Sequence, residues 1–339
     1  MYAALRPSAA SVLTLALIVQ PARPRVETLR ATGGLPAHIA GTFLRPIGFQ
    51  QADDSAYFVF DRRAHGVYTV VGDAVKKIVE VGAEAGRVLD PGAFDIDPGD
   101  GSFVIADAPF GDARIQTFTA GGSRLGGFYL AGKQKARLTL DTLVLNGVGS
   151  IQYTGRTILI NQPELDSLIT ELAFDGTPVR TIGALRATGQ ADRDVHLAMN
   201  AGFPLVNPRG GFYFVFSAGV PIFRKYDAAG TLLFERHIEG PELDDYLRTL
   251  PTTWPKRGTD QGDILPIVAP AVRAAGVDRQ GRLWVSLSAP FTYVYDANGD
   301  KLRTFQLKGA DVLTPNSLFF TRDGRLLVTP GCYEFRLPM

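Results

Sequence analysis

The chain has 339 residues, 45% of them hydrophobic, which is enough for two ordinary domains or one large repetitive domain. Its 35 Lys and Arg residues balance 34 Asp and Glu residues, and no block of like charge occurs. A basic surface for nucleic acid or an anionic membrane is therefore excluded. The single cysteine, Cys332, excludes an intrachain disulfide, an iron–sulfur cluster and a multi-cysteine zinc site. With 37 glycines and 22 prolines, the chain is expected to form short elements joined by turns.

The first 22 residues are predicted to be an export signal. Arg6 supplies a positive charge, residues 9–19 form an apolar run, and Ala22 offers a small residue for cleavage. The run is shorter than the roughly 20 residues that span a bilayer, and no cysteine follows it closely, so we expect no membrane helix and no lipid anchor. An apolar N-terminus without a targeting role is the alternative. The prediction is a periplasmic or secreted protein.

Beyond residue 25 the sequence repeats a pattern of short alternating strands separated by glycine turns. The clearest copy spans residues 274–307. The other copies are predicted at residues 42–81, 93–130, 149–182, 203–237 and 317–337, and corresponding corners are marked by Gly101, Gly155, Gly211, Gly281 and Gly324. The last copy has only three strands, whereas residues 26–30 form an unpaired strand near the N-terminus.

These six copies predict an all-β fold, a six-bladed β-propeller with four antiparallel strands in each blade. We expect residues 26–30 to complete the last blade, because this closure joins both ends of the chain and removes exposed sheet edges. Two stacked β-sandwiches are the alternative, but they leave the repeated Asp-x-x-Gly corners unexplained. The propeller is expected to occupy residues 23–339 as a single domain.

Three of the copies resemble NHL repeats, which build six-bladed β-propellers. The residues that carry the resemblance are Gly276-Val-Asp-Arg-Gln-Gly-Arg-Leu-Trp-Val285, the segment from Phe94 to Asp107, and Leu318-Phe-Phe-Thr-Arg-Asp-Gly-Arg-Leu-Leu-Val328. The resemblance implies the fold over nearly the whole chain after the signal. It does not select a function, because NHL-like propellers include peptide lyases, lactonases and binding scaffolds.

The residues just before the innermost strand of each blade are expected to meet at one mouth of the central channel. They are Arg45, Asp90, Asn146, His196 or Asn200, Arg273 and Asn316. Such a polar ring would bind an anionic or hydroxylated small molecule, with Arg45 and Arg273 as bidentate partners of a carboxylate or phosphate. The alternative is a channel filled with water, whose polar walls satisfy one another.

A long insertion, residues 241–271, follows the fourth blade. It contains a predicted helical turn at residues 241–250 and a large apolar side chain, Trp254, through which the loop can pack on the propeller. Loops of this length without regular structure are usually functional or disordered. We expect this insertion to pack over the channel face as a lid, with Trp254 among the ligand contacts.

A metal site is a second possibility at the same mouth. Asn146 and Asn316 resemble the asparagines that hold calcium in gluconolactonase-like propellers, and Asp90 would supply a carboxylate, a ligand that calcium favours. The glutamate segment that opens the first blade of that family is absent here. His65 and His196 lie in loops expected on the channel side, where either is a candidate general base. Loop histidines are more often simply solvated.

The sequence therefore predicts an exported, monomeric propeller that binds a small molecule, a peptide or a partner protein at the channel mouth. The alternative is a metal-assisted hydrolase or lactonase, dependent on calcium, that uses the same mouth.

Overall fold

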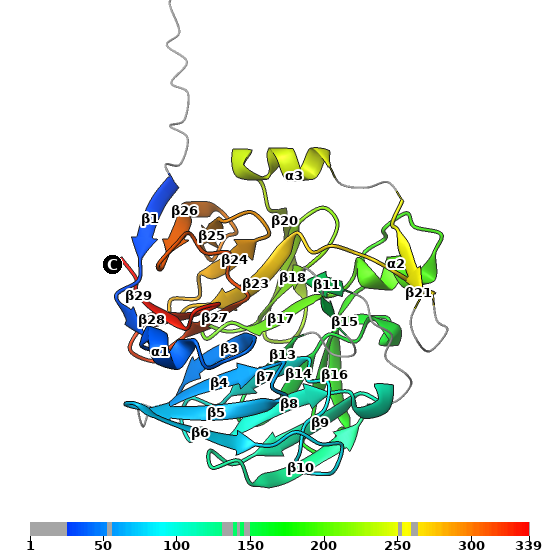
Figure 1. Ribbon diagram of the computed structural model, residues 1–339. Coiled ribbons are helices and arrows are strands. Elements are labelled where there is room, and N and C mark those ends of the chain that lie inside the picture. Colours follow the sequence, from blue (N-terminus) through cyan, green and yellow to red (C-terminus); the bar gives the residue numbers. More distant parts are fainter. Residues whose placement is uncertain are drawn as a thin grey trace, which may run out of the picture.

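The computed structural model describes residues 26–52, 56–130, 138–140, 143–145, 150–249, 253–258 and 264–338. Six small antiparallel sheets are arranged around a central axis, which confirms the six-bladed β-propeller (Figure 1). The expected export signal, residues 1–22, lies outside the described residues. No helix in the described part of the chain is long and apolar enough to cross a membrane.

The blades follow one another along the chain. Blade 1 consists of β3 (Pro46–Gln51), β4 (Tyr57–Asp61), β5 (Gly66–Val71) and β6 (Ala74–Val79); blade 2 of β7 (Ala93–Ile96), β8 (Phe103–Asp107), β9 (Arg114–Phe118) and β10 (Arg124–Tyr129); blade 3 of β13 (Ile151–Tyr153), β14 (Ile158–Ile160), β15 (Ser167–Leu172) and β16 (Pro178–Ala184). Blade 4 consists of β17 (Gly202–Val206), β18 (Phe212–Phe216), β19 (Ile222–Tyr226) and β20 (Leu232–His237); blade 5 of β23 (Val272–Val277), β24 (Leu283–Leu287), β25 (Thr292–Tyr295) and β26 (Lys301–Lys308); blade 6 of β27 (Ser317–Phe320), β28 (Arg325–Thr329) and β29 (Tyr333–Arg336). In every blade the first strand is the innermost.

The hydrophobic core lies between the blades. Strands β8, β18 and β24 are buried along their whole length because a neighbouring sheet covers each of their faces, so their sequences are nearly continuous apolar runs. The outer strand β20 is mostly exposed and mixes charged with apolar residues. Rings from different strands stack across the interfaces, as Phe60 does on Phe94 with ring centroids 5.2 Å apart. The hydrophobic content is thus spread over several inter-blade layers.

An N-terminal strand closes the ring, but the strand is not the one expected from the sequence. Residues of β1 (Val26–Arg30) pair in parallel with β26 and form a fifth strand of blade 5, so their assignment to the last blade is wrong. Blade 6 is completed by β2 (Gly33–Gly34), which pairs with β29. Gly34 has a φ of 123°, and a Cβ there would lie 2.2 Å from the carbonyl oxygen of Cys332, so this approach requires glycine.

The Asp-x-x-Gly corners have the expected local chemistry. At the corner after β23, the N–H of Gly281 donates to the carbonyl oxygen of Asp278 at 2.9 Å. The Asp278 side chain accepts from the backbone N–H groups of Gln280 and Arg282 at 2.9 and 3.0 Å. The turn is therefore specified within five residues, which explains why it was visible in the sequence.

The remaining elements lie in the connections. They are α1 (Ala37–Ala40), η1 (Pro109–Gly111), the hairpin of β11 (Leu138–Leu140) and β12 (Leu143–Leu145), η2 (Pro163–Leu165) and α2 (Arg193–Ala198). The insertion contains η3 (Pro241–Leu243), α3 (Asp244–Arg248) and a hairpin of β21 (Lys256–Gly258) and β22 (Ile264–Pro266). Lys256 forms an ion pair with Asp192 at 2.5 Å, and Asp192 also caps the N-terminus of α2. The hairpin is thereby tied to α2, beside blade 4 (Figure 1).

Candidate functional site

The innermost strands of all six blades line a central cavity of about 330 Å³. Each innermost strand pairs with only one neighbour, so its second edge faces the channel and leaves backbone groups without a strand partner. These groups must be satisfied by side chains or by water. The cavity is therefore the place where polar side chains are needed inside the propeller.

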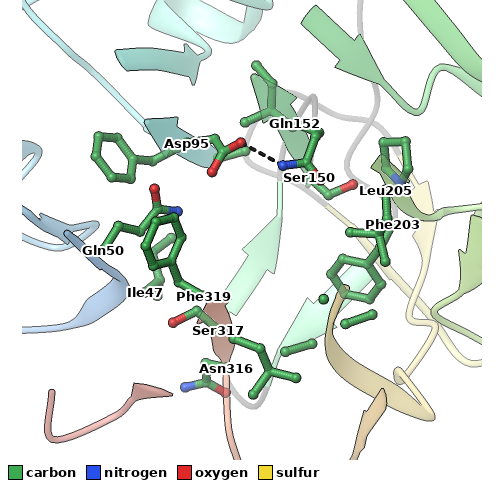
Figure 2. Close-up of a pocket in the computed structure, with 18 of the residues that line it drawn as sticks. Ile47, Gln50, Asp95, Ser150, Gln152, Phe203, Leu205, Asn316, Ser317 and Phe319 are labelled. Atoms are coloured by element: carbon green, nitrogen blue, oxygen red, sulfur yellow. Dashed lines mark hydrogen bonds between the residues drawn. The ribbon is translucent and has the colours of Figure 1, made fainter. Parts of the chain in front are cut away.

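Blades 1 to 3 meet this need with three polar side chains, which form one wall of the cavity (Figure 2). We call Gln50, Asp95 and Gln152 the polar wall. Gln50 Oε1 accepts from the N–H of Ile96 at 2.9 Å. Asp95 Oδ2 accepts from the N–H of Tyr153 at 2.7 Å and from Gln152 Nε2 at 3.0 Å. Each of these side chains connects the innermost strand of one blade to that of the next.

Asp95 has an unusual environment for a carboxyl group. It is only 6% exposed, and burial raises its pKa from 3.8 to about 7 although Tyr153, Gln50 and Gln152 donate hydrogen bonds to it. Within the described residues, no Lys, Arg or His forms an ion pair with it. The cavity therefore contains a carboxyl group that changes its charge near neutral pH.

Blades 4 and 6 supply large apolar side chains to the cavity lining. We call this group the apolar wall: Phe203 and Leu205 of β17, and Leu318, Phe319 and Phe320 of β27. Figure 2 shows Phe203 and Phe319 among the side chains around the open centre of the cavity, into which the Asp95 carboxyl group also faces. Leu205 is 8% exposed and packs into the cluster between blades 4 and 5, whereas Phe203 and Phe319 are half-buried. A ligand in this cavity would contact both hydrogen-bonding groups and aromatic rings.

Two guanidinium groups give the cavity positive charge. Arg273 lines it beside Asn316, whose Oδ1 accepts from Arg273 Nε at 3.0 Å and from Nη2 at 2.6 Å. Arg62 also lines it, and its pKa is lowered mainly by burial and further by the nearby charge of Arg45, while Asp90 opposes the shift. Guanidinium groups bind anions through paired hydrogen bonds, so both residues are candidate contacts of an anionic ligand.

Of the residues predicted to form the mouth, Arg273 and Asn316 line the cavity. Arg45 does not line it but lies near Arg62, and its backbone N–H donates to Asp61. Asp90 is exposed, and its N–H donates to His65 Nδ1 at 3.3 Å outside the cavity lining. Asn146 lies outside the described residues.

The three remaining candidates take part in contacts around α2. Asn200 is fully buried, and its side chain bonds the backbone N–H and carbonyl of Arg186, so it holds the loop that follows blade 3. His196 Nδ1 is hydrogen-bonded to Thr188 Oγ1 at 2.8 Å. Trp254 packs against a small cluster that includes Ala198 and Val268. None of the three lines the cavity, and among the described residues of the insertion only Pro270 does.

Gln50, Asp95, Gln152 and Arg62 were not predicted from the sequence. The predicted residues were those just before each innermost strand, whereas the polar wall comes from within those strands. A signal was present, since Asp95 stands between Phe94 and Ile96 in an otherwise apolar strand. A polar residue within an apolar innermost strand is thus a useful marker of a channel wall.

The described residues do not fit the calcium site that gluconolactonase-like propellers suggest. No group of three or more His, Cys, Asp or Glu residues within the described ranges is arranged to hold a metal. The amide oxygen of Asn316 is occupied by two donors of the Arg273 guanidinium, whose charge opposes a cation at that position. Asp90, the expected carboxylate ligand, lies outside the cavity lining.

Comparison with known proteins supports the fold. No protein-family model matches the chain, and no curated protein matches it in sequence. A gluconolactonase from Xanthomonas campestris has 18% identity and a TM-score of 0.53, with 94% of this chain and 99% of that chain covered. A catalytically inactive virginiamycin B lyase from Staphylococcus aureus with quinupristin has 12% identity and a TM-score of 0.50, with 84% and 77% covered. The chain is thus similar in fold to these propellers.

Proposed function

We propose that the protein binds a small molecule in the central cavity, with an anionic group of the ligand near Arg62 and Arg273 and an apolar body against the apolar wall. The observation that carries the proposal is the division of one cavity of about 330 Å³ into the polar wall, the apolar wall and two guanidinium groups. Ligand pockets typically combine apolar lining with a few placed polar groups, in volumes of about 300–1,000 Å³.

The size and charge of the cavity favour a small molecule over a peptide or a partner protein as the ligand. A folded partner cannot enter a channel enclosed by six innermost strands, and its contacts would be confined to the rim loops. An anionic ligand gains most because guanidinium groups bind carboxylate, sulfonate and phosphate oxygens with paired hydrogen bonds.

The probe for this proposal is 8-anilinonaphthalene-1-sulfonate, which combines aromatic rings with an anion and fluoresces in apolar surroundings. We expect saturable binding with one site per chain. Arg62→Gln and Arg273→Gln should each weaken it about tenfold, which corresponds to about 1.4 kcal/mol. Phe203→Ala should weaken it similarly by removing part of the apolar wall.

Two matched controls separate the cavity from the rest of the surface. Arg279→Gln removes an exposed arginine from the corner after β23, and Phe110→Ala removes a phenylalanine that is 81% exposed. Both should leave the affinity within about twofold of wild type, because exposed side chains away from the site contribute little. The proposal fails if the probe binds without saturation, or if the controls weaken binding as much as the cavity variants do.

A further inference from the structure

Within the described residues, the Asp95 carboxyl group accepts several hydrogen bonds but forms no ion pair with a cation. The N–H of Tyr153 and Gln152 Nε2 both donate to Oδ2, at 2.7 and 3.0 Å, and the Gln50 amide also donates to the carboxyl group. These donors stabilise the ionised form, yet burial outweighs them. Buried carboxylates in proteins are usually paired with a positive charge or a metal.

The cavity has space for a cationic group beside Asp95. Asp95 lines the open space, and Figure 2 shows its carboxyl group facing that space. The groups around the carboxyl are neutral amides, and the hydroxyl of Tyr153 is turned to Ser102, 3.2 Å away. The charged residues Arg62 and Arg273 line the same cavity, and neither forms an ion pair with Asp95 in the described part of the chain.

The apolar wall adds a second feature that suits a cation. The rings of Phe203 and Phe319 stand at the rim of the same open space (Figure 2). Aromatic faces attract ammonium groups, and the attraction grows when water is excluded. An amine between Asp95 and these rings would therefore be bound by a carboxylate on one side and aromatic surface on the other.

We propose that the ligand of the central cavity carries a protonated amine that pairs with Asp95. This inference rests on the proposed small-molecule binding and narrows the ligand class. Together with an anionic group near Arg62 and Arg273, it describes a small zwitterionic molecule with an apolar body.

The test compares two probes of nearly equal shape, 2-phenylethylamine and 2-phenylethanol, by calorimetry at pH 8. The wild-type protein should bind the amine at least tenfold more tightly than the alcohol. Asp95→Asn keeps the size of the side chain but removes the negative charge, so it should reduce the preference to about twofold or less. The affinity for 2-phenylethanol should change by no more than about threefold.

Asp97→Asn is the matched control, because Asp97 follows the same strand but does not line the cavity. This variant should keep the preference for the amine. If Asp95→Asn does not fold, the wild-type protein provides the second measurement, since the preference should fall at least fivefold between pH 8 and pH 5 while the amine stays protonated. An equal preference at both pH values would overturn the proposal.

The outcomes separate this inference from the proposed function. If 8-anilinonaphthalene-1-sulfonate binds through Arg62 and Arg273 but the amine is not preferred, only the pairing with Asp95 is wrong. If neither that probe nor either phenylethyl compound binds in the cavity, both proposals are wrong.

Discussion

Blades 1 to 3 and blades 4 to 6 build the two sides of one cavity with different chemistry. On the first side, Gln50 and Asp95 accept hydrogen bonds from backbone N–H groups of the next blade's innermost strand. On the second side, Leu205 and Phe319 pack into the hydrophobic layers between blades. Blade 4 also places Pro204 in its innermost strand, a residue without an N–H to satisfy. The polarity of each side thus follows from how its strand edges are satisfied.

The polar wall has two roles. The same side chains that connect the innermost strands are the ones a ligand would meet, so their substitution affects both stability and binding. In the apolar wall, different residues carry these two roles. Leu205 is buried in the core, whereas the half-buried Phe203 borders the open space. Substitutions in the polar wall should therefore change both stability and ligand binding. In the apolar wall, substitution of Leu205 should mainly lower stability and substitution of Phe203 should mainly weaken binding.

The largest expected effect concerns Asp95. Because its folded pKa is raised from 3.8 to about 7, the group stabilises the fold most below pH 4, and this contribution is lost as the pH rises through 7. Relative to wild type, Asp95→Asn should therefore gain on the order of 4 kcal/mol in unfolding free energy between pH 4 and pH 8. Urea unfolding at several pH values measures this difference. A difference that stays constant with pH would contradict the assigned environment of Asp95.

The next effect is on the apolar wall. Leu205→Ala removes a side chain that is 8% exposed and packs with Tyr213 and Val285 between blades 4 and 5. Such a truncation should cost about 3 kcal/mol of unfolding free energy, measured by urea denaturation. Leu233, which is 54% exposed on the outer strand β20, is the control, and Leu233→Ala should change stability by about 0.5 kcal/mol or less. Equal losses for both variants would mean that this wall is not part of the core.

A smaller loss is expected from the polar wall. Gln50→Leu preserves the approximate size of the side chain but leaves the N–H of Ile96 without its acceptor, so it should cost about 1–3 kcal/mol. Hydrogen exchange at the Ile96 amide should accelerate together with the fall in stability. Gln280→Leu, at an exposed position of the corner after β23, serves as the reference and should be nearly neutral. Unchanged exchange at Ile96 would show that the hydrogen bond does not hold the strand edge.

The smallest effect is expected from calcium. Because Asn316 is already bonded to Arg273 and the polar wall holds one carboxyl group, millimolar calcium or EDTA should shift the melting temperature by about 1 °C or less. Scanning calorimetry with and without each additive provides the measurement, and magnesium serves as an ionic control. A calcium-specific rise of several degrees would restore the metal-dependent hydrolase as the better interpretation.

Much of the fold was predictable because its signals are local. The alternation within strands such as β23 and the Asp278–Gly281 corner are set by residues a few positions apart. The closure was harder to assign, because β1 pairs with residues nearly 280 positions away. Both β26 and β29 lie near the N-terminal segment, and the choice between them depends on packing that includes Leu29 in the cluster around Trp284.

The candidate site was only partly predictable for a related reason. Asn316 directly precedes β27, and Arg273 is the second residue of β23. Both were predicted because the strand positions follow from the sequence pattern to within a residue or two. The hydrogen-bonded environment of Asp95 was not predictable. Its partners Gln50 and Gln152 belong to other blades and approach it only when the ring is assembled.

By itself, the sequence determined the strands, their corners and the number of blades, because alternation and turn chemistry act over short distances. Only the tertiary structure decided which strand closes the ring and which side chains share the cavity. Those outcomes depend on the packing of blades far apart in the chain, and the same packing raises the pKa of Asp95 by removing water from its carboxyl group.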